Sequence, residues 1–253
     1  MYRRIMVPLD GSEQAERALA LAARIGRSAG GAVTLMQVVS AGAARGSDAV
    51  PVHAGGRVSG GDRRSAAEYL QRMRQHPALV DVPTTVVVRA GSPAEQIVAE
   101  AERRGADLIV ISHRHHGPAA PLVFGSVADD LMRQAHVPVL VLHSDAAAEL
   151  VGVSAARPVQ ALVPLDGSPF AERAIPRAIE LLRALETGQG AALHLTYVLD
   201  PKHAYRYDTP ETEAMHRART YLEKTARDVK ADPLNRAVAV SWAIETDAEV
   251  VTG

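Results

Sequence analysis

Cysteine is absent from this 253-residue chain, and its absence excludes several kinds of chemistry. Without thiols the chain cannot form a disulfide framework, supply a cysteine nucleophile, or hold zinc or an iron–sulfur cluster through cysteine. Redox chemistry by the protein's own side chains is therefore excluded as a function.

A large excess of charge of one sign is also lacking, as are long apolar runs. The 28 Lys and Arg residues nearly balance the 29 Asp and Glu residues, which argues against a broad nucleic-acid-binding surface. No stretch of 18 apolar residues occurs, and Pro8 and Asp10 break the first apolar run, so we expect neither a membrane span nor a signal peptide. The sequence predicts a cytoplasmic protein that binds neither membranes nor nucleic acid.

An internal repeat divides the chain. The segment from Ile5 to Leu19 recurs 156 positions later, from Ala161 to Ile175, with identities that include Val-Pro-Leu-Asp-Gly-Ser and Ala-Glu-Arg-Ala. Chance composition does not readily produce such a match. Because repeats define the architecture, we expect two domains rather than a single α/β barrel of about 250 residues.

Each copy begins with the pattern of a strand, a tight turn and a helix, because a short apolar run leads into Asp-Gly and then a Ser ahead of apolar positions at helical spacing. Continuous apolar runs at 108–111 and 137–142 are typical of parallel strands buried on both faces. Further strands are expected at 33–39 and 84–89, and helices at 62–75 and 93–104. This alternation predicts the α/β class, with a doubly wound parallel sheet.

The second copy follows the same order and then ends. Strands are expected at 160–164, 193–199 and 238–244, with helices up to 186 and from 211 to 229. Val250 and Val251 align with Ile97 and Val98, which leaves no counterpart of residues 101–143. We therefore expect a complete domain at 1–143, a linker at 144–158, and a second domain at 159–253 that lacks its last two strands.

Two Asp and two Ser residues in the repeated motif have structural explanations. Asp10 and Asp166 precede glycines, where an Asp side chain commonly shapes a turn by bonding nearby backbone. Ser12 and Ser168 precede expected helices, where a hydroxyl commonly caps the first turn. We expect these roles rather than acid–base or nucleophilic catalysis.

One loop is the candidate for ligand binding, because open parallel sheets bind ligands at the carboxyl ends of their strands. It runs from Ser112 to Ser126 in the first repeat. Gly125 permits close approach of the backbone, Ser126 is placed to cap the next helix, and the N–H groups of Val127 and Ala128 would face an anion. A capped helix without any ligand explains these residues equally well.

Several motifs in order resemble the universal stress protein family. They are the Val-Pro-Leu-Asp-Gly-Ser opening of each repeat, the Val-Val end of the second strand, the Ala-Asp-Leu-Ile-Val run, and the Gly-Ser-Val-Ala-Asp-Asp-Leu segment. The resemblance covers residues 1–143 fully and 159–253 as a shortened copy. It implies a Rossmann-like fold in two tandem repeats, dimerisation through the last strand, and membership of either an ATP-binding or a non-binding branch.

The resemblance also locates a nucleotide site. The ATP-binding branch has glycines spaced G-x2-G-x9-G before Ser or Thr. The third glycine and the hydroxyl fall on Gly125 and Ser126, whereas the first two glycines fall on Ser112 and His115. A Cβ at such positions occupies ligand space, or costs about 1–2 kcal/mol where the backbone is left-handed. The resemblance therefore predicts weak or no ATP binding by the first repeat.

The family's other contacts to the nucleotide fall on residues that match its pattern. The family's acidic residue near the adenosine falls on Asp10, and its backbone contact to adenine falls on Val38 and Val39. The second repeat keeps the acid as Asp166 but has no phosphate loop in this sequence. The adenine-nucleotide pocket is thus expected in the first repeat.

The leading hypothesis is a non-enzymatic stress-response binding and regulatory protein whose nucleotide pocket is degenerate. ATP, with Mg²⁺ if it binds, is the candidate cofactor, and no catalytic residue and no metal site of the protein's own are expected. Two alternatives stay open: slow ATP hydrolysis at the same loop, and a nucleotide-independent module that binds partners. The expected assembly is a homodimer or a pairing of the two repeats within one chain.

Overall fold

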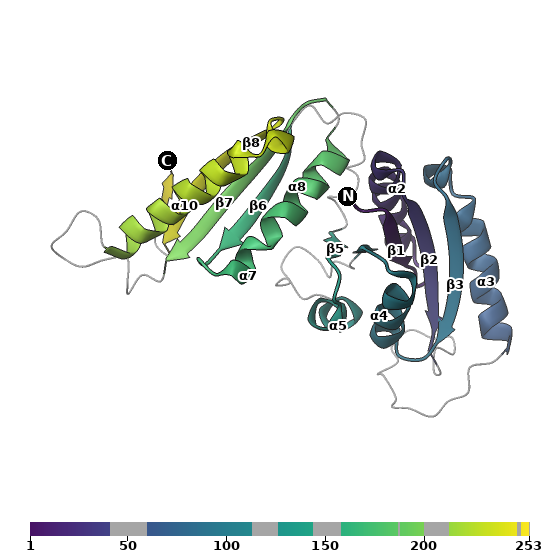
Figure 1. The fold of residues 1–253 in the computed structure, drawn as a ribbon. Helices are drawn as coiled ribbons and strands as arrows, with labels where there is room; N and C mark the ends of the chain where they lie inside the picture. Colours follow the sequence, from purple (N-terminus) through teal and green to yellow (C-terminus); the bar gives the residue numbers. More distant parts are fainter. Residues whose placement is uncertain are drawn as a thin grey trace. The chain divides into compact units, whose positions relative to one another are not determined.

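The computed structural model describes residues 1–40, 60–112, 126–143, 158–186, 188–199, 213–246 and 249–252. They belong to two compact units, Met1–Val153 and Ser154–Gly253 (Figure 1). Each unit contains one β-sheet with its own helices. The two units are described separately below.

The first unit contains a five-stranded sheet in the order β3-β2-β1-β4-β5. Every neighbouring pair of strands is parallel, as the alternation of strands and helices predicted. The strands are β1 Arg4–Pro8, β2 Ala32–Val39, β3 Thr84–Ala90, β4 Leu108–Ser112 and β5 Val139–Leu142. The helices are α1 Glu13–Glu16, α2 Ala18–Ala29, α3 Gly60–Arg74, α4 Pro93–Arg104 and α5 Ser126–Gln134, with a short 3₁₀ turn, η1, at Pro77–Leu79.

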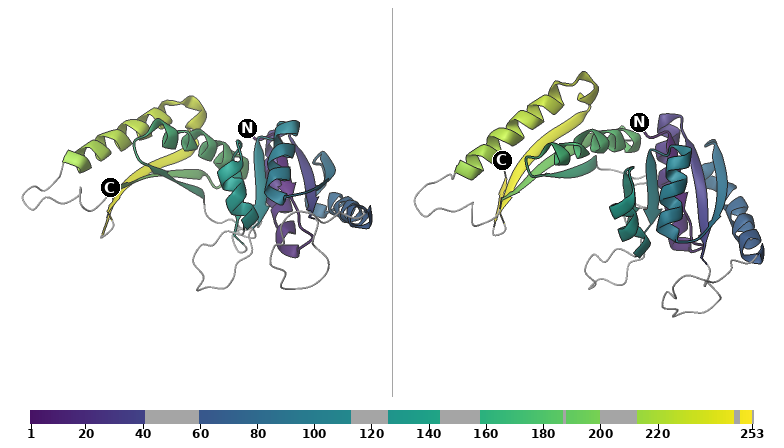
Figure 2. Two further views of the ribbon diagram at one scale, coloured as in Figure 1. Left: turned by 90° about the horizontal axis from the view of Figure 1, so that it is seen from below. Right: turned by 60° about the horizontal axis from the view of Figure 1, so that its bottom comes forward.

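Helices cover both faces of this sheet (Figure 2). On one face, Met6 and Met36 pack in one buried cluster with residues of α4 and α5, such as Ile97 and Leu131. On the other face, Gly26 of α2 lies against Ile5 of β1, because a Cβ on Gly26 would come 3.6 Å from the Ile5 side chain. Ile5 and Met6 are consecutive in β1, so their side chains point to opposite faces of the sheet. The sheet of the first unit is therefore doubly wound, which confirms the predicted fold class.

The helix after β1 is divided in two, whereas the sequence predicted one continuous helix. α1 ends at Glu16, and the backbone N–H of Arg17 donates to the carbonyls of Ala15 and Gln14 before α2 begins at Ala18. The same break occurs in the second unit, at Arg173. Such short-range bonds tighten the chain at a helix end, and apolar periodicity alone does not reveal them.

The second unit contains a four-stranded sheet in the order β6-β7-β8-β9. Its strands are β6 Val159–Leu165, β7 Ala191–Leu199, β8 Val238–Thr246 and β9 Glu249–Thr252. Its helices are α7 Pro169–Glu172, α8 Ala174–Leu185 and α10 Glu213–Ala231, with a 3₁₀ turn, η2, at Pro233–Asn235. β6, β7 and β8 are parallel, as expected from the repeat.

α8 and α10 pack on the same face of this second sheet (Figure 1). Their buried residues form one cluster with Leu193 and Leu195 of β7, and Trp242 of β8 packs against the same cluster. The opposite face includes Leu162 and Val198, which are 61% and 60% exposed. Among the described residues of the second unit, no helix corresponds to α4 and α5, which cover the equivalent face of the first sheet.

β9 differs from the expected alignment. Val250 and Val251 were aligned with helical residues of the first repeat, but they lie in a strand that pairs antiparallel with β8, with Val251 opposite Ile244. An edge strand such as β8 offers unpaired backbone groups, and the β-branched sequence Val-Val-Thr favours an extended partner. The second sheet is therefore mixed rather than wholly parallel.

Candidate functional site

The turn after β1 is shaped by Asp10. Its Oδ1 accepts hydrogen bonds from the backbone N–H of Ser12 at 2.9 Å and from the Ser12 hydroxyl at 2.5 Å. Gly11 has a φ of +88°, a value that favours glycine. The Ser12 hydroxyl oxygen in turn accepts from the N–H of Ala15 at 3.2 Å. The predicted turn and capping roles are therefore confirmed.

A side-chain hydrogen bond joins this turn to the end of β4. Nε2 of Gln14 donates to Oγ of Ser112 at 2.9 Å, between residues 98 positions apart. β1 and β4 are neighbours in the sheet and parallel, so their carboxyl ends meet at the same edge. Asp10 and Ser112, which the sequence placed in one pocket, therefore border the same edge of the first sheet.

Val38 and Val39 lie at the same edge, at the end of β2. Val38 packs against the buried cluster formed with α4 and α5. The carbonyl of Val39 accepts a hydrogen bond from the N–H of Gly91 at 3.2 Å, just past β3. This carbonyl is thus already bonded within the protein.

Ser126 and Val127 lie in the first turn of α5. Ser126 is helical and is the first residue of α5 that the structure describes. The first N–H groups of an α-helix have no helical acceptor, and Ser126 is exposed. The other two predicted site residues of this loop, His115 and Gly125, lie outside the described residues.

The second unit repeats the turn with a different neighbour. The N–H of Ser168 donates to Oδ1 of Asp166 at 2.8 Å, and Ser168 caps α7 through the N–H of Ala171. The hydroxyl of Tyr197 donates to the backbone carbonyl of Asp166 at 3.2 Å. Hydrogen bonds from Ser168 lower the pKa of Asp166 below its ordinary value.

The comparisons with known proteins agree with this duplicated turn. The model of the "Universal stress protein family" matches residues 1–143 and again 160–252. The chain belongs to the universal stress protein family.

Relatives within this family match one or both units. Universal stress protein MJ0531 of Methanocaldococcus jannaschii is 29% identical over 145 residues, 56% of this chain and 82% of its own length. A universal stress protein from Archaeoglobus fulgidus has a TM-score of 0.66 at 17% identity and covers 97% of this chain and 79% of its own. Another from that organism, solved with dAMP, is 27% identical over 55% of this chain and 97% of its own, with a TM-score of 0.42.

Sequence reasoning missed a contact that links the third helix of this universal stress protein to the turn motif. The hydroxyl of Tyr69 in α3 donates to Oε1 of Glu16 at 3.0 Å. Burial and this hydrogen bond raise the pKa of Tyr69. Glu16 belongs to the repeated Ala-Glu-Arg-Ala segment, but its partner could not be identified without knowing how α3 packs.

A second missed contact recurs in both units. Arg27 of α2 donates to the carbonyl of Ala78 in η1 at 2.5 Å, and Arg183 of α8 donates to the carbonyl of Leu234 in η2. These two pairs are related by the same offset of 156 residues as the turn motif. The repeat therefore extends beyond the opening segment, in contacts as well as in sequence.

Metal-binding clusters and membrane-spanning helices are both missing from the part of the chain that the structure describes. Within it, no group of three or more His, Asp or Glu side chains is placed to hold a metal ion. None of its helices combines the length and apolarity needed to cross a bilayer. Among the described residues, the carboxyl edge of the first sheet brings together the carboxylate of Asp10, the hydroxyls of Ser12 and Ser112, and the side-chain amide of Gln14.

Proposed function

We propose that this universal stress protein is a stress-response binding and regulatory protein, not an enzyme, with a degenerate adenine-nucleotide pocket in its first unit. The hydrogen bond from Gln14 to Ser112 carries the proposal. Ser112 stands where the ATP-binding pattern requires its first glycine. A triphosphate approaching the end of β4 would meet the Ser112 side chain and displace this bond, and both effects weaken binding.

The direct test is calorimetry of ATP binding to the purified full chain, with and without Mg²⁺. We expect a dissociation constant in the millimolar range or weaker, or about −4 kcal/mol of binding free energy at most. Mass spectrometry of the denatured protein should detect no co-purified nucleotide. Tight, stoichiometric ATP binding would contradict the degenerate-pocket proposal.

A rescue variant sharpens the test. Ser112→Gly combined with His115→Gly restores the two missing glycines and should tighten ATP binding about tenfold or more, since it removes two side chains from the phosphate path. Adding Gly125→Val to this variant should abolish the gain. An unchanged affinity in the double variant would contradict the assignment of the pocket to this loop. ATP turnover by the wild-type chain that Ser126→Ala abolishes would favour slow hydrolysis instead.

The assembly and domain limits belong to the same proposal. β5 is an edge strand of the first sheet, which supports a homodimer formed by pairing of these strands; pairing between the two repeats is the alternative. We propose 1–143 and 159–253 as the two domains, joined by a linker at 144–158. Light scattering that shows a concentration-independent monomer of one-chain mass would contradict the homodimer.

Cytoplasmic location and the lack of nucleic-acid binding stay predictions from the sequence.

A further inference from the structure

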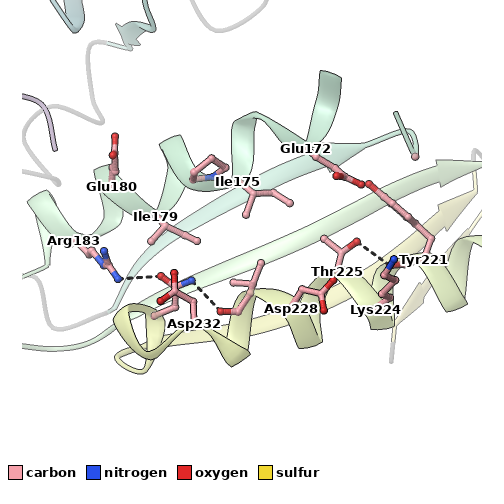
Figure 3. Close-up of a pocket in the computed structure, with 14 residues that line it drawn as sticks. Glu172, Ile175, Ile179, Glu180, Arg183, Tyr221, Lys224, Thr225, Asp228 and Asp232 are labelled. Atoms are coloured by element: carbon pink, nitrogen blue, oxygen red, sulfur yellow. Dashed lines mark hydrogen bonds between the residues drawn. The ribbon is translucent and has the colours of Figure 1, made fainter. Parts of the chain in front are cut away.

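A groove with a volume of about 670 Å³ runs along the second unit between α8 and α10 (Figure 3). We call it the α8–α10 groove. Ile175 and Ile179 of α8 and Val229 of α10 contribute its apolar side chains, and each is almost fully buried. The groove also includes residues of η2, at the end of α10. None of its residues belongs to the proposed nucleotide pocket.

The repeat shows which side chains of this groove differ from those of the first unit. With the offset of 156, Thr225 occupies the position of Tyr69, the residue that reaches across to Glu16 in the first unit. Thr225 is far smaller, and its hydroxyl donates to the carbonyl of Tyr221 in its own helix at 2.9 Å. Tyr221, one turn earlier, points toward Glu172 at one end of the groove (Figure 3). The ring against the glutamate of the repeated segment thus comes from Tyr221 in the second unit, and the groove has a small threonine where α3 of the first unit has Tyr69.

The charges of the groove are inverted relative to the first unit. Asp228 lines the groove where the first unit has Arg72, and Asp232 lines it where the first unit has His76. Glu180 likewise replaces Arg24.

The two cations of the groove offset these carboxylates only in part. Arg183 is engaged with the carbonyl of Leu234 and with Oδ1 of Asn235. Lys224 lines the groove as a second cation, whereas four carboxylates line it, including Glu172 at one end. Glu180 is also paired with Arg177, outside the lining, at 3.2 Å. With that pair included, the groove still combines largely buried apolar side chains with a net negative charge.

We propose that the α8–α10 groove binds a basic amphipathic helix of a partner protein. From Ile175 to Arg183 the groove follows α8 for about 12 Å at 1.5 Å per residue, a length that suits about two turns of a partner helix better than a small cation. Ile175 and Ile179 are one turn apart and offer a floor for apolar anchors at i and i+4. Asp228 and Asp232 attract lysines or arginines beside those anchors. This proposal is independent of nucleotide binding.

The probes are fluorescein-labelled 14-residue peptides with Leu at i, i+4 and i+7 and either Lys, Arg or Glu at the other positions. Fluorescence anisotropy with the full chain should show binding of the Lys and Arg peptides that weakens as NaCl is raised. The Glu peptide and a scrambled Lys peptide should bind at least about tenfold more weakly, because one lacks the charge and the other the apolar stripe. Equal binding by the Glu peptide, or binding by neither basic peptide, would overturn the proposal.

Two variants test whether the peptide binds in the groove. Each introduces the residue that the first unit has at the equivalent position, Arg72 for Asp228 and Tyr69 for Thr225. Asp228→Arg should weaken peptide binding about tenfold, because it replaces attraction by repulsion. Thr225→Tyr should abolish binding by filling the groove. The matched control is Glu223→Arg, which makes a similar charge change at an exposed position of α10 outside the groove.

The controls also separate the proposed partner from other occupants. Circular dichroism melts should show that all three variants remain folded, and Glu223→Arg should change peptide affinity less than about twofold. Equal losses from Glu223→Arg and Asp228→Arg would overturn the proposal, because they would indicate a nonspecific charge effect. Competition by spermine at equal charge concentration would overturn it in favour of a small polyamine. Concentration-dependent dimerisation abolished by Thr225→Tyr would overturn it in favour of a second copy of this chain.

Discussion

Glu100 is a charged residue in the interior of the first unit. It is only 1% exposed, although the charged residues that follow it in α4, at 102–104, suggest a solvated helix surface. Oε2 accepts from Nε of Arg89 at 3.0 Å and from Nε of Arg103 at 2.9 Å, and Oε1 accepts from Nε of Arg104 at 2.6 Å. Three guanidinium groups thus replace the water that the buried carboxylate has lost.

Glu100→Gln should destabilise the first unit by about 2–3 kcal/mol. Breaking a buried ion pair commonly costs about 3–5 kcal/mol, but the three arginine side chains are 38%, 52% and 39% exposed, so water compensates part of the loss. Urea unfolding measures the change. Glu102→Gln, on the same helix with its side chain 56% exposed, is the control and should stay within about 0.5 kcal/mol of the wild type.

The same variant has a pH signature. Burial by itself raises the pKa of Glu100, but the hydrogen bonds from Arg104 and Arg103 and the charge of Arg89 outweigh it, so the pKa lies below its ordinary value of 4.5. A lowered folded-state pKa means that the stabilisation is present above the unfolded-state pKa and is lost as the pH falls through the folded value. The stability difference between wild type and Glu100→Gln should shrink as the pH falls below about 4.5. A constant difference down to pH 2 would contradict this assignment.

At the scale of elements, the approach of β1 to β2 depends on one glycine. A Cβ on Gly31 would lie 2.6 Å from the carbonyl oxygen of Arg3, and the next residue, Ala32, donates its N–H to that same oxygen at 2.8 Å. The obstacle is backbone directly before the first paired residue of β1, so it cannot turn aside as a flexible side chain would.

Gly31→Ala should therefore destabilise the first unit by about 2 kcal/mol, within the usual range for overpacking. Gly60→Ala, in α3 and with no described neighbour within 4 Å of the new Cβ, should be neutral or slightly stabilising. Thermal melts of the two variants measure the contrast. Equal melting temperatures would show that the β1–β2 junction relaxes freely around the added methyl group.

Sequence patterns predicted these elements well wherever the signal is local. The Ser92-Pro93 start and Gly105 end define α4, and its observed bounds, Pro93–Arg104, agree with the prediction. β9 could not be predicted in this way, because its strand state depends on pairing with β8. The burial of Glu100 and the partner of Gln14 also depend on residues distant in sequence. Local propensity cannot encode such contacts, since tertiary packing decides them.

At the scale of the whole molecule, the two units have separate hydrophobic cores. One buried cluster consists of residues between Met6 and Leu131, and another consists of residues between Val163 and Ile244. Leu35 of β2 and Leu195 of β7 occupy matching positions of their sheets, and each is 0% exposed. The single tryptophan, Trp242, lies opposite Leu195 in the register of the second sheet, so its fluorescence reports on the second unit.

Leu35→Ala and Leu195→Ala should therefore act on different unfolding transitions. Each replacement leaves a cavity that costs about 2–5 kcal/mol, which lowers the melting temperature of a unit of this size by about 10 °C or more. Trp242 fluorescence should follow the loss in Leu195→Ala and stay at the wild-type temperature in Leu35→Ala. Far-UV circular dichroism, which reports on both units, should register both losses. An equal shift of the Trp242 transition in the two variants would instead show that the repeats unfold as one cooperative unit, because only then would a cavity in the first core destabilise the second.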